Sequence, residues 1–466
     1  MAPRIFLVWP GSEHGLIKSR WHAMHSKRYI FMFAQTGRPR YPAPPGADSL
    51  PLFNVWVRKG LKKMVETSRG QEFNGKMVIS ILALLSVFAP LSTDMYLSAF
   101  SDIQSFLRAE DGALELSLSV FFLGLCAGQL LFGPLIDRYG RRVPLLTGIA
   151  IFCGATVMLL LTSSASLFIF LRFIQAVGAC GGMVVGRAVV SDLYKGVRAA
   201  RAMTMLLMFM ALGPILSPLL GGILVSYLGW KSIFMTMLTI GMLAFLLSAL
   251  FLPETLPPHA RSAASLLKSF GSYRKLFVSR KYMIVSLVSA FVQAAMFVFI
   301  TASSSVFQGI FGLSSIEYGL AFALVSLSLL LSSWLNNRLL MFFSVEKIIS
   351  TALPVFLMTS LILISVSDTD KLWVFITPLC VAIALVGLLG ANATTIAMEA
   401  AHGLSGVGSA FTGALQFGVA FACSAAVAAC ISESALPLAM GMTIPAVIAL
   451  LLWLFYSFSA KSDGLR

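Results

Sequence analysis

The sequence predicts an all-α integral membrane protein with twelve transmembrane helices in two six-helix halves. The 466 residues are 58% hydrophobic and only 11% charged, with a mean hydropathy of +0.89, whereas soluble domains carry roughly 25% charged residues. Twelve apolar runs reach the length of about 20 residues that a spanning helix needs, and one long polar segment divides them six and six. This composition excludes a soluble enzyme and a disordered chain.

The predicted spans follow one another from Met77 to near the C-terminus. They cover residues 77–100, 114–136, 143–161, 166–190, 203–226, 231–252, 283–305, 317–336, 347–367, 371–392, 404–428 and 436–459. A membrane β-barrel would instead show segments of about ten residues in which apolar and polar side chains alternate. The sequence does not alternate in this way, so helices are predicted throughout.

Residues 1–76 differ in composition from the rest of the chain. They are rich in basic residues, contain the proline cluster RPRYPAPPGADSLP, and hold no apolar run of spanning length. Two alternatives remain open: a disordered basic extension, or a segment ahead of the true translation start, which would then lie near Met64. The functional residues are therefore expected after Met77.

The basic residues predict the orientation of the chain. Sixteen Lys and Arg side chains lie in one alternating set of connections and the C-terminal tail, against three in the other set. Because cytoplasmic loops are enriched in Lys and Arg, the first set and both termini are predicted to be cytoplasmic, in a bacterial inner membrane. The net charge of +15 then reflects orientation within lipid, with no nucleic-acid partner, and we expect a monomer.

The long polar segment organises the predicted domains. Residues 77–252 form the N-terminal half, 253–282 a cytoplasmic linker, 283–459 the C-terminal half and 460–466 a tail. The linker opens with PETLPP, which ends the sixth helix, and its SLLKSFGSYRKLF segment has the spacing of an amphipathic helix lying along the membrane face. Two halves joined in this way are typical of transporters built from repeats.

Two charged residues at matching depth form the candidate site. A charge near the bilayer centre costs about 2.5–3.5 kcal/mol, so each is a functional candidate. Asp94 and Arg172 both fall roughly 9 Å inside the outer boundary at 1.5 Å per residue, which predicts that they face a common polar cavity. We interpret Asp94 as a proton-binding carboxylate beside a guanidinium; the alternative is a structural ion pair. Arg187, near Asp192, is assigned to a charge cluster at the cytoplasmic end.

Other polar residues in the spans have two interpretations. Each either lines a cavity or makes a helix–helix hydrogen bond; they are Gln129, Gln175, Gln293, Asn392 and Gln416. The six cysteines lack CxxC spacing and histidine neighbours, so neither a metal site nor disulfides are predicted. Motifs of metalloproteases, serine hydrolases and nucleotide-binding loops are absent from the sequence, and no cofactor is predicted.

Several motifs resemble a known family. GPLIDRYGRRVPLL, between the second and third spans, resembles the signature of the major facilitator superfamily, with Gly133, Asp137, Arg138, Gly140, Arg141 and Arg142 in place. LRFIQAVGACGG resembles the span-four motif of its drug:proton antiporters, with Arg172, Gln175 and Gly178. ALGPILSPLLGG resembles their span-five antiporter motif, through Gly213, Pro214, Pro218, Gly221 and Gly222.

Three further segments narrow the resemblance. STDMYLSAF with Asp94, GRAVVSDLY with Arg187 and Asp192, and LPETLPP resemble the bicyclomycin/chloramphenicol-resistance (Bcr/CflA) group of multidrug exporters. That group usually has proline where this chain has Ser98. The resemblance covers residues 77–460.

The resemblance implies a function and roles for these residues. Asp94 would exchange protons and sense cationic or neutral drug, Arg172 would couple protonation to the conformational change, and the 137–142 loop would latch the inner gate. In that latch, the Asp137 charge would be available to a facing helix N-terminus and to arginines such as Arg187. The expected activity is drug export driven by proton influx. The same fold exporting a metabolite such as a sugar, amino acid or short peptide is the alternative; a receptor has no need for an acid–base pair at one depth.

Overall fold

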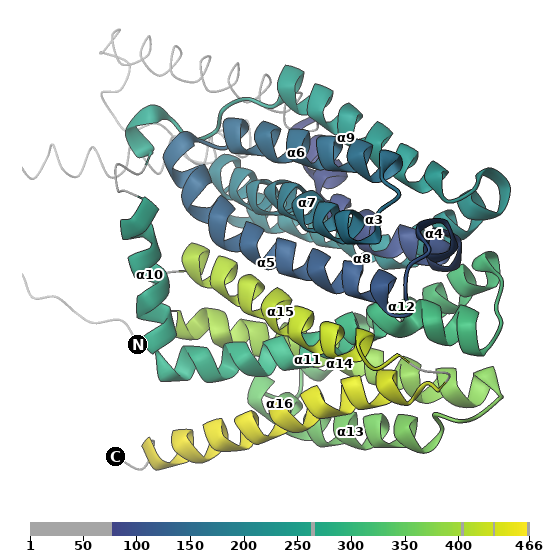
Figure 1. Ribbon diagram of the computed structural model, residues 1–466. Helices are drawn as coiled ribbons and strands as arrows, with labels where there is room; N and C mark the ends of the chain where they lie inside the picture. The colour runs from purple at the N-terminus through teal and green to yellow at the C-terminus, as the bar shows by residue number, and fades with distance from the viewer. Residues whose placement is uncertain (1–76, 262–265, 402–404, 432–433, 464–466) are drawn as a thin grey trace, which may run out of the picture. The chain divides into compact units, whose positions relative to one another are not determined.

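The computed structural model describes residues 77–261, 266–401, 405–431 and 434–463. The predictions made for residues 1–76 and for the end of the tail lie outside these ranges. Twelve helices in the described ranges are long and apolar enough to cross a membrane. The predicted number of spans and the helical fold class are therefore confirmed (Figure 1).

The first span, Met77–Leu107, consists of several helical pieces. After residues 77–86 come α3 (Phe88–Asp94), the 3₁₀-helix η2 (Met95–Ala99) and α4 (Phe100–Leu107). The remaining spans of the first half are α5 (Ala113–Tyr139), α6 (Arg142–Leu161), α7 (Ala165–Leu193), α8 (Gly196–Leu228) and α9 (Lys231–Phe251).

The segment between the halves contains η3 (Pro258–Ala260) and α10 (Leu266–Val278). The second half consists of α11 (Arg280–Ser304) with its π-helical continuation η4 (Ser305–Ile310), α12 (Ser315–Leu339), α13 (Val345–Ser365), α14 (Leu372–Ala400), α15 (Ser405–Ala428) and α16 (Leu436–Asp463). Several helices run past the predicted span ends. A helix can continue into the polar membrane surface because its backbone N–H and C=O groups keep their hydrogen bonds there.

Two pairs of helices join the halves. Helix α5 packs against α15, and α8 packs against α12. The α5–α15 contact extends along both helices. It includes Gly112 beside the Ala428 carbonyl near one end and Gly133 beside Ala410 near the other. Small residues at these points allow the backbones to approach closely.

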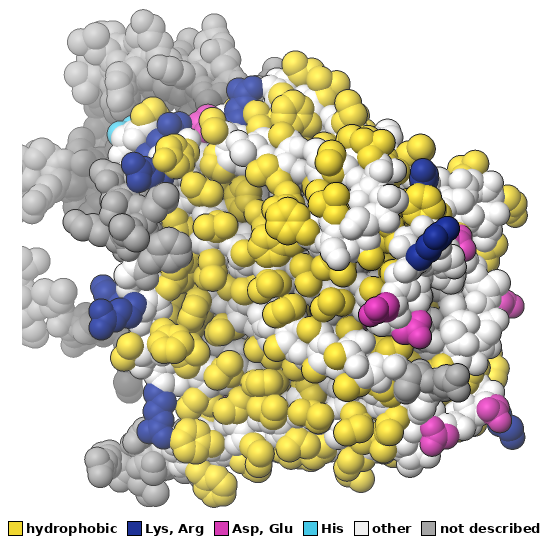
Figure 2. All heavy atoms as spheres, in the orientation of Figure 1, with side chains coloured by type: hydrophobic (Ala, Val, Ile, Leu, Met, Phe, Trp, Pro, Cys, Tyr) yellow, Lys and Arg dark blue, Asp and Glu magenta, His cyan; other side chains and the backbone are white. Residues whose placement is uncertain are grey.

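The ends of the bundle differ in charge. We call the end that carries α10 and the 137–142 loop the linker end, and the opposite end, with the loop at residues 108–112, the far end. Figure 2 shows hydrophobic side chains over the middle of the visible face and Lys and Arg side chains at the linker end. Large exposed apolar residues such as Leu161, Phe170 and Tyr227 are expected on a surface that faces lipid.

Candidate functional site

Asp94 lies at a break in the first span. Helix α3 ends at this residue, and the next five residues, Met95–Ala99, form the tighter η2. Asp94 is 1% exposed, and its Oδ1 atom has no hydrogen-bond partner among the described residues. A buried carboxyl oxygen without a partner is costly unless the group is protonated or meets a ligand.

Arg172 of α7 is enclosed by the same part of the first span. Its Nη2 donates to the Ser92 carbonyl (2.7 Å), and its Nη1 donates to Gln175 Oε1 (2.6 Å). The guanidinium also lies over the rings of Tyr96 (4.0 Å) and Phe121 (4.4 Å). Cation–π contacts of this kind contribute about 0.5–2 kcal/mol each and offset part of the cost of burial.

Asp94 and Arg172 form no ion pair in the described structure. The guanidinium binds the backbone of Ser92, two residues before Asp94. Gln175 extends the network to Thr156 of α6 through a 2.8 Å hydrogen bond. Arg172 therefore stabilises the turn that precedes the Asp94 carboxyl group. The polar cavity that Asp94 and Arg172 were predicted to share remains a prediction.

The η2 segment also carries polar contacts to the second half. The Leu97 carbonyl accepts hydrogen bonds from Ser304 Oγ (3.0 Å) and Gln308 Nε2 (3.2 Å). The Ser98 carbonyl accepts one from Ser315 Oγ at 3.1 Å. These bonds hold the two halves together at the far end, within four residues of Asp94.

The span-five glycines lie where helices meet closely. Gly221 of α8 has the Met95 carbonyl where a side chain would begin, Gly222 has the Ser315 carbonyl there, and Gly213 has the Pro90 ring. Pro214 and Pro218 lie within α8, and the Pro218 carbonyl accepts a 2.9 Å hydrogen bond from Ser98 Oγ. Helix α8 can therefore contact both η2 and α12 without an intervening side chain.

Gly178 has a packing role within the first half. A Cβ there would lie 2.6 Å from both the Gly148 carbonyl oxygen and the Phe152 backbone nitrogen on α6. The glycine thus brings α7 against α6, one helix turn beyond Gln175.

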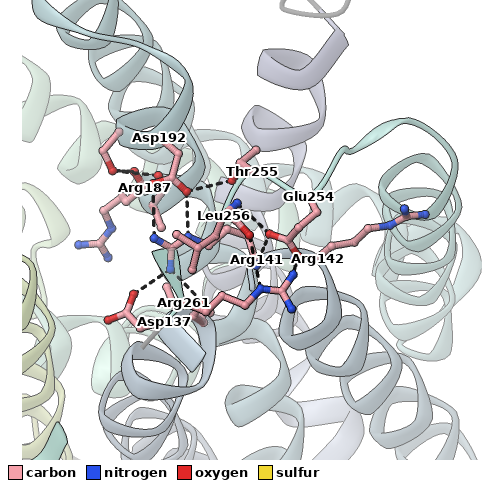
Figure 3. A network of polar contacts seen from close by, with 12 residues as sticks. Asp137, Arg141, Arg142, Arg187, Asp192, Glu254, Thr255, Leu256 and Arg261 are labelled. Atoms are coloured by element: carbon pink, nitrogen blue, oxygen red, sulfur yellow. Dashed lines mark hydrogen bonds and ion pairs between the residues drawn. The ribbon is translucent and has the colours of Figure 1, made fainter. Parts of the chain in front are cut away.

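A second cluster of charges occupies the linker end (Figure 3). Arg141 pairs with Asp137 (Nη1–Oδ1, 2.8 Å) and with Asp192 at the end of α7 (Nε–Oδ2, 2.9 Å). Asp137 is 59% exposed in its side chain and Asp192 only 19%. Exposed ion pairs contribute little to stability. The Arg141–Asp192 pair, which joins the 137–142 loop to α7, is therefore stronger than the Arg141–Asp137 pair within the loop.

Glu254 is a member of this cluster that the sequence argument overlooked. Its Oε1 accepts the backbone N–H of Arg141 (2.8 Å) and its Oε2 that of Arg142 (3.3 Å), at the start of α6. Burial alone would raise its pKa, but these backbone donors, the Leu256 N–H and the Arg261 guanidinium together lower it. Gly140, with φ of +90°, leaves room for the carboxylate. The sequence signal for this residue is the glutamate of PETLPP, directly after the predicted end of the sixth span.

The remaining arginines differ from expectation. Arg187 makes no ion pair with Asp137 or Asp192 in the described structure; its side chain donates to the Met183 carbonyl (3.4 Å) and to Ser409 Oγ on α15 (3.5 Å). Figure 3 shows its guanidinium turned away from Asp192. The assignment of Arg187 to the charge cluster is not what the structure shows, because Arg141 occupies both carboxylates.

The two other basic residues of the loop lie at its edge. Arg138 is exposed and rests on the neighbouring Tyr139 ring at 5.5 Å. The Arg142 side chain donates to the Ala249 carbonyl near the end of α9, which ties α6 to α9.

The other polar candidates separate into two kinds. Asn392 donates to Asn336 Oδ1 (2.7 Å) and thereby joins α14 to α12, and Gln416 donates to Ser289 Oγ (3.0 Å) and joins α15 to α11. Gln293 contacts Met296 on its own helix. Gln129 of α5 has a buried amide nitrogen without a partner among the described residues and faces α15 at Gly413.

Comparison with known proteins identifies the family. Residues 82–423 match the model of the Major Facilitator Superfamily. The chain is 27% identical over 394 residues to the bicyclomycin resistance protein homolog of Haemophilus influenzae, covering 83% of this chain and 98% of the relative. It is 28% identical over 342 residues to multidrug resistance protein D of Escherichia coli, covering 73% and 85%.

Solved structures show the same fold. The D-xylose–proton symporter superposes with a TM-score of 0.64 at 16% identity, over 82% of this chain and 96% of the symporter. A bacterial homolog of the human lysosomal transporter Spinster superposes with a TM-score of 0.61 at 17% identity, over 82% and 96%. The chain belongs to the major facilitator superfamily and is a membrane transporter rather than an enzyme.

Proposed function

We propose that this protein is a proton-driven multidrug exporter that exchanges small lipophilic or cationic antimicrobials for protons by alternating access. The observation that carries the proposal is the buried carboxyl of Asp94, whose Oδ1 lacks a hydrogen-bond partner at the point where α3 gives way to η2. The names of the bicyclomycin and multidrug resistance relatives support the substrate class.

The position of Asp94 supports a role in coupling. The five residues that follow it bind the second half through the Leu97 and Ser98 carbonyls. A change in the charge of Asp94 acts at the base of this segment, so protonation and opening of the far end are mechanically connected. Arg172 binds the preceding turn through the Ser92 carbonyl and thereby fixes the backbone that leads into Asp94.

The charge of the loops supports the orientation. The linker end carries the 137–142 loop and the basic residues of α10, and we place it in the cytoplasm. Drug then enters from the linker end and displaces the proton of Asp94, and a proton from the far end displaces the drug. The membrane potential adds about 2.3 kcal/mol per charge per 100 mV to the driving force.

Everted membrane vesicles that are acidic inside test this function. A pH-sensitive dye reports proton release when chloramphenicol-like and lipophilic cationic drugs are added in turn. Three proteins are compared: wild type, Asp94→Asn, and Asp102→Asn as a matched control, since Asp102 is an exposed carboxylate on the same span.

Drug-triggered release in wild type and Asp102→Asn that is lost in Asp94→Asn supports the proposal. Release that persists in Asp94→Asn leaves an exporter but removes Asp94 from the coupling. If folded wild type gives no proton release with any drug, the exchange of drug for protons is wrong, and export of a metabolite becomes the better hypothesis.

A further inference from the structure

The far end contains a polar cavity that crosses the boundary between the halves. It has a volume of about 330 Å³ and is lined by α4 and α5 from the first half and by the end of α11, η4 and the start of α12 from the second. Serine and glutamine side chains make up much of its lining, and the one titratable side chain among the lining residues is Glu115.

Glu115 links the halves through this cavity. It lies in the first turn of α5 with 6% of its surface exposed, and its Oε1 accepts a hydrogen bond from Ser305 Oγ at the start of η4. The neighbouring Ser304 binds the Leu97 carbonyl. Glu115 is therefore the one carboxylate among the polar contacts that hold η2 and α5 to the second half at the far end of the described structure.

The charges around Glu115 are few. Asp111, just before α5, is an acidic residue four positions ahead of Glu115, and Tyr96 of η2 donates to or accepts from Ser117 of the same helix turn at 2.8 Å. Asp111 is itself held by Gln104 Nε2 of α4 at 2.8 Å. On the α12 side, Glu317 caps its own helix through Ser314. No described lysine or arginine forms an ion pair with Glu115, so its protonation alone decides the charge at this contact.

We propose that Glu115 is a second proton-binding site, distinct from Asp94, which latches the far end shut when ionised and releases it when protonated. An ionised carboxylate accepts a hydrogen bond about twice as strongly as a neutral group does. A hydronium ion entering the cavity transfers its proton to the Glu115 carboxylate, which forms an O–H bond and leaves a neutral water. The Ser305 hydroxyl then donates to a neutral carboxyl group, which is a weaker acceptor. When the far end closes, the proton returns to a water molecule and leaves as hydronium.

This inference rests on the proposed exchange of drug for protons. It explains when in the transport cycle the far end opens. The far end would open more readily when protons are plentiful outside, which is the moment when Asp94 can be reprotonated and drug expelled. A hydrogen bond to a charged acceptor exceeds a neutral one by roughly 1 kcal/mol, so the ratio of open to closed far ends should rise about five- to tenfold on protonation.

The test measures opening of the far end directly. Spin labels at Ser163→Cys in the loop between α6 and α7 and Asp370→Cys in the loop between α13 and α14 report the distance between the halves, because both residues are exposed at this end. The six native cysteines are replaced. Distances are recorded by pulsed electron paramagnetic resonance from about pH 8 to about pH 4, a range that contains the ordinary titration of Glu.

Four variants share this labelled background. Glu115→Gln keeps the shape of the side chain but does not titrate, and Ser305→Ala removes the donor. Glu110→Gln is the matched control, an exposed carboxylate five residues earlier. Asp94→Asn separates the latch from the coupling site.

We expect acidification to open the far end in the labelled parent, in Glu110→Gln and in Asp94→Asn. Glu115→Gln and Ser305→Ala should be open at high pH already and change less than twofold with pH. An acid-induced opening that persists in Glu115→Gln, or its absence from a parent that still couples drug to proton flux, overturns the latch and leaves the proposed function intact. If the labelled parent opens in acid but shows no drug-coupled proton flux, the proposed exporter function is wrong and the latch stands.

Discussion

Gly319 of α12 offers a sensitive test of how closely the two halves meet. A Cβ at this position would lie 2.8 Å from the Leu219 Cα atom and 2.9 Å from the Pro218 oxygen, both on the backbone of α8. Ordinary contact begins at 3.4 Å, so Gly319→Ala must move α12 away from α8 by about 0.6 Å. Backbone atoms cannot turn aside as a flexible side chain would.

The expected magnitude follows from the packing at this point. Inserting a methyl group into a well-packed interface costs about 1–3 kcal/mol. The Pro218 carbonyl also accepts the Ser98 hydrogen bond at 2.9 Å, so the displacement strains the contact between α8 and η2 as well. The strain exists only when the far end is closed, and we expect its closed population to fall by roughly 5- to 150-fold relative to the open one.

The labelled pair at Ser163 and Asp370 measures this shift. Gly154→Ala is the matched control, because Gly154 also lies inside a helix but has nothing within 4 Å of the added methyl group. Any gain in helix propensity is common to both variants. If Gly319→Ala has the same distance distribution as Gly154→Ala, the close approach of α8 and α12 does not control the far end.

Three further predictions concern the charge cluster at the linker end. Glu254→Gln should lower the free energy of unfolding by about 0.5–2 kcal/mol through loss of the cap on α6. Because folding lowers the pKa of Glu254, this stabilisation is present above the unfolded pKa and lost as pH falls through the folded one, so melting curves of the two proteins should converge in acid; a constant gap would contradict the assignment. Gly140 has φ of +90°, and the Glu254 carboxylate lies where a Cβ would be. Gly140→Ala should therefore lower the free energy of unfolding by about 1–3 kcal/mol. An unchanged melting temperature would mean that Glu254 does not fix this turn. Asp192→Asn should reduce transport and stability more than Asp137→Asn, since its bond to Arg141 is less exposed; equal effects would argue against this ranking.

Hydropathy alone was sufficient to predict the fold class. Each span presents about 20 apolar residues, and the bilayer allows few other structures for such a run. The start of α8 at Gly196 and the end of α14 at Ala400 lie beyond the predicted spans, because a helix continues into the polar surface where hydropathy no longer marks it.

The partners of the charged residues were harder to predict. Counting residues from a span end gives depth, and depth predicted that Asp94 and Arg172 lie in one layer. Depth does not give the rotation of a helix about its axis, which turns the Arg172 guanidinium to the Ser92 carbonyl. For the same reason Arg187 was predicted to belong to the charge cluster near Asp192, although Arg141 binds that carboxylate.

Contacts between the halves could not be predicted from one sequence. Ser305 and Glu115 are separated by 190 positions, and no local pattern relates them. The sequence shows that a helix begins near Glu115 but not which residues of the second half cover it. Backbone breaks such as η2 and η4 were missed for a similar reason, since tertiary contacts decide where an apolar helix departs from α geometry.

Proton release from the purified protein tests the central claim most directly. Drug is added to wild type and to Asp94→Asn in weakly buffered detergent solution, and an indicator dye records the protons released while drug binding is measured separately. Our account predicts that wild type releases protons as drug binds and that Asp94→Asn binds drug without releasing them. Equal release from both proteins would contradict the claim that drug and proton compete at Asp94.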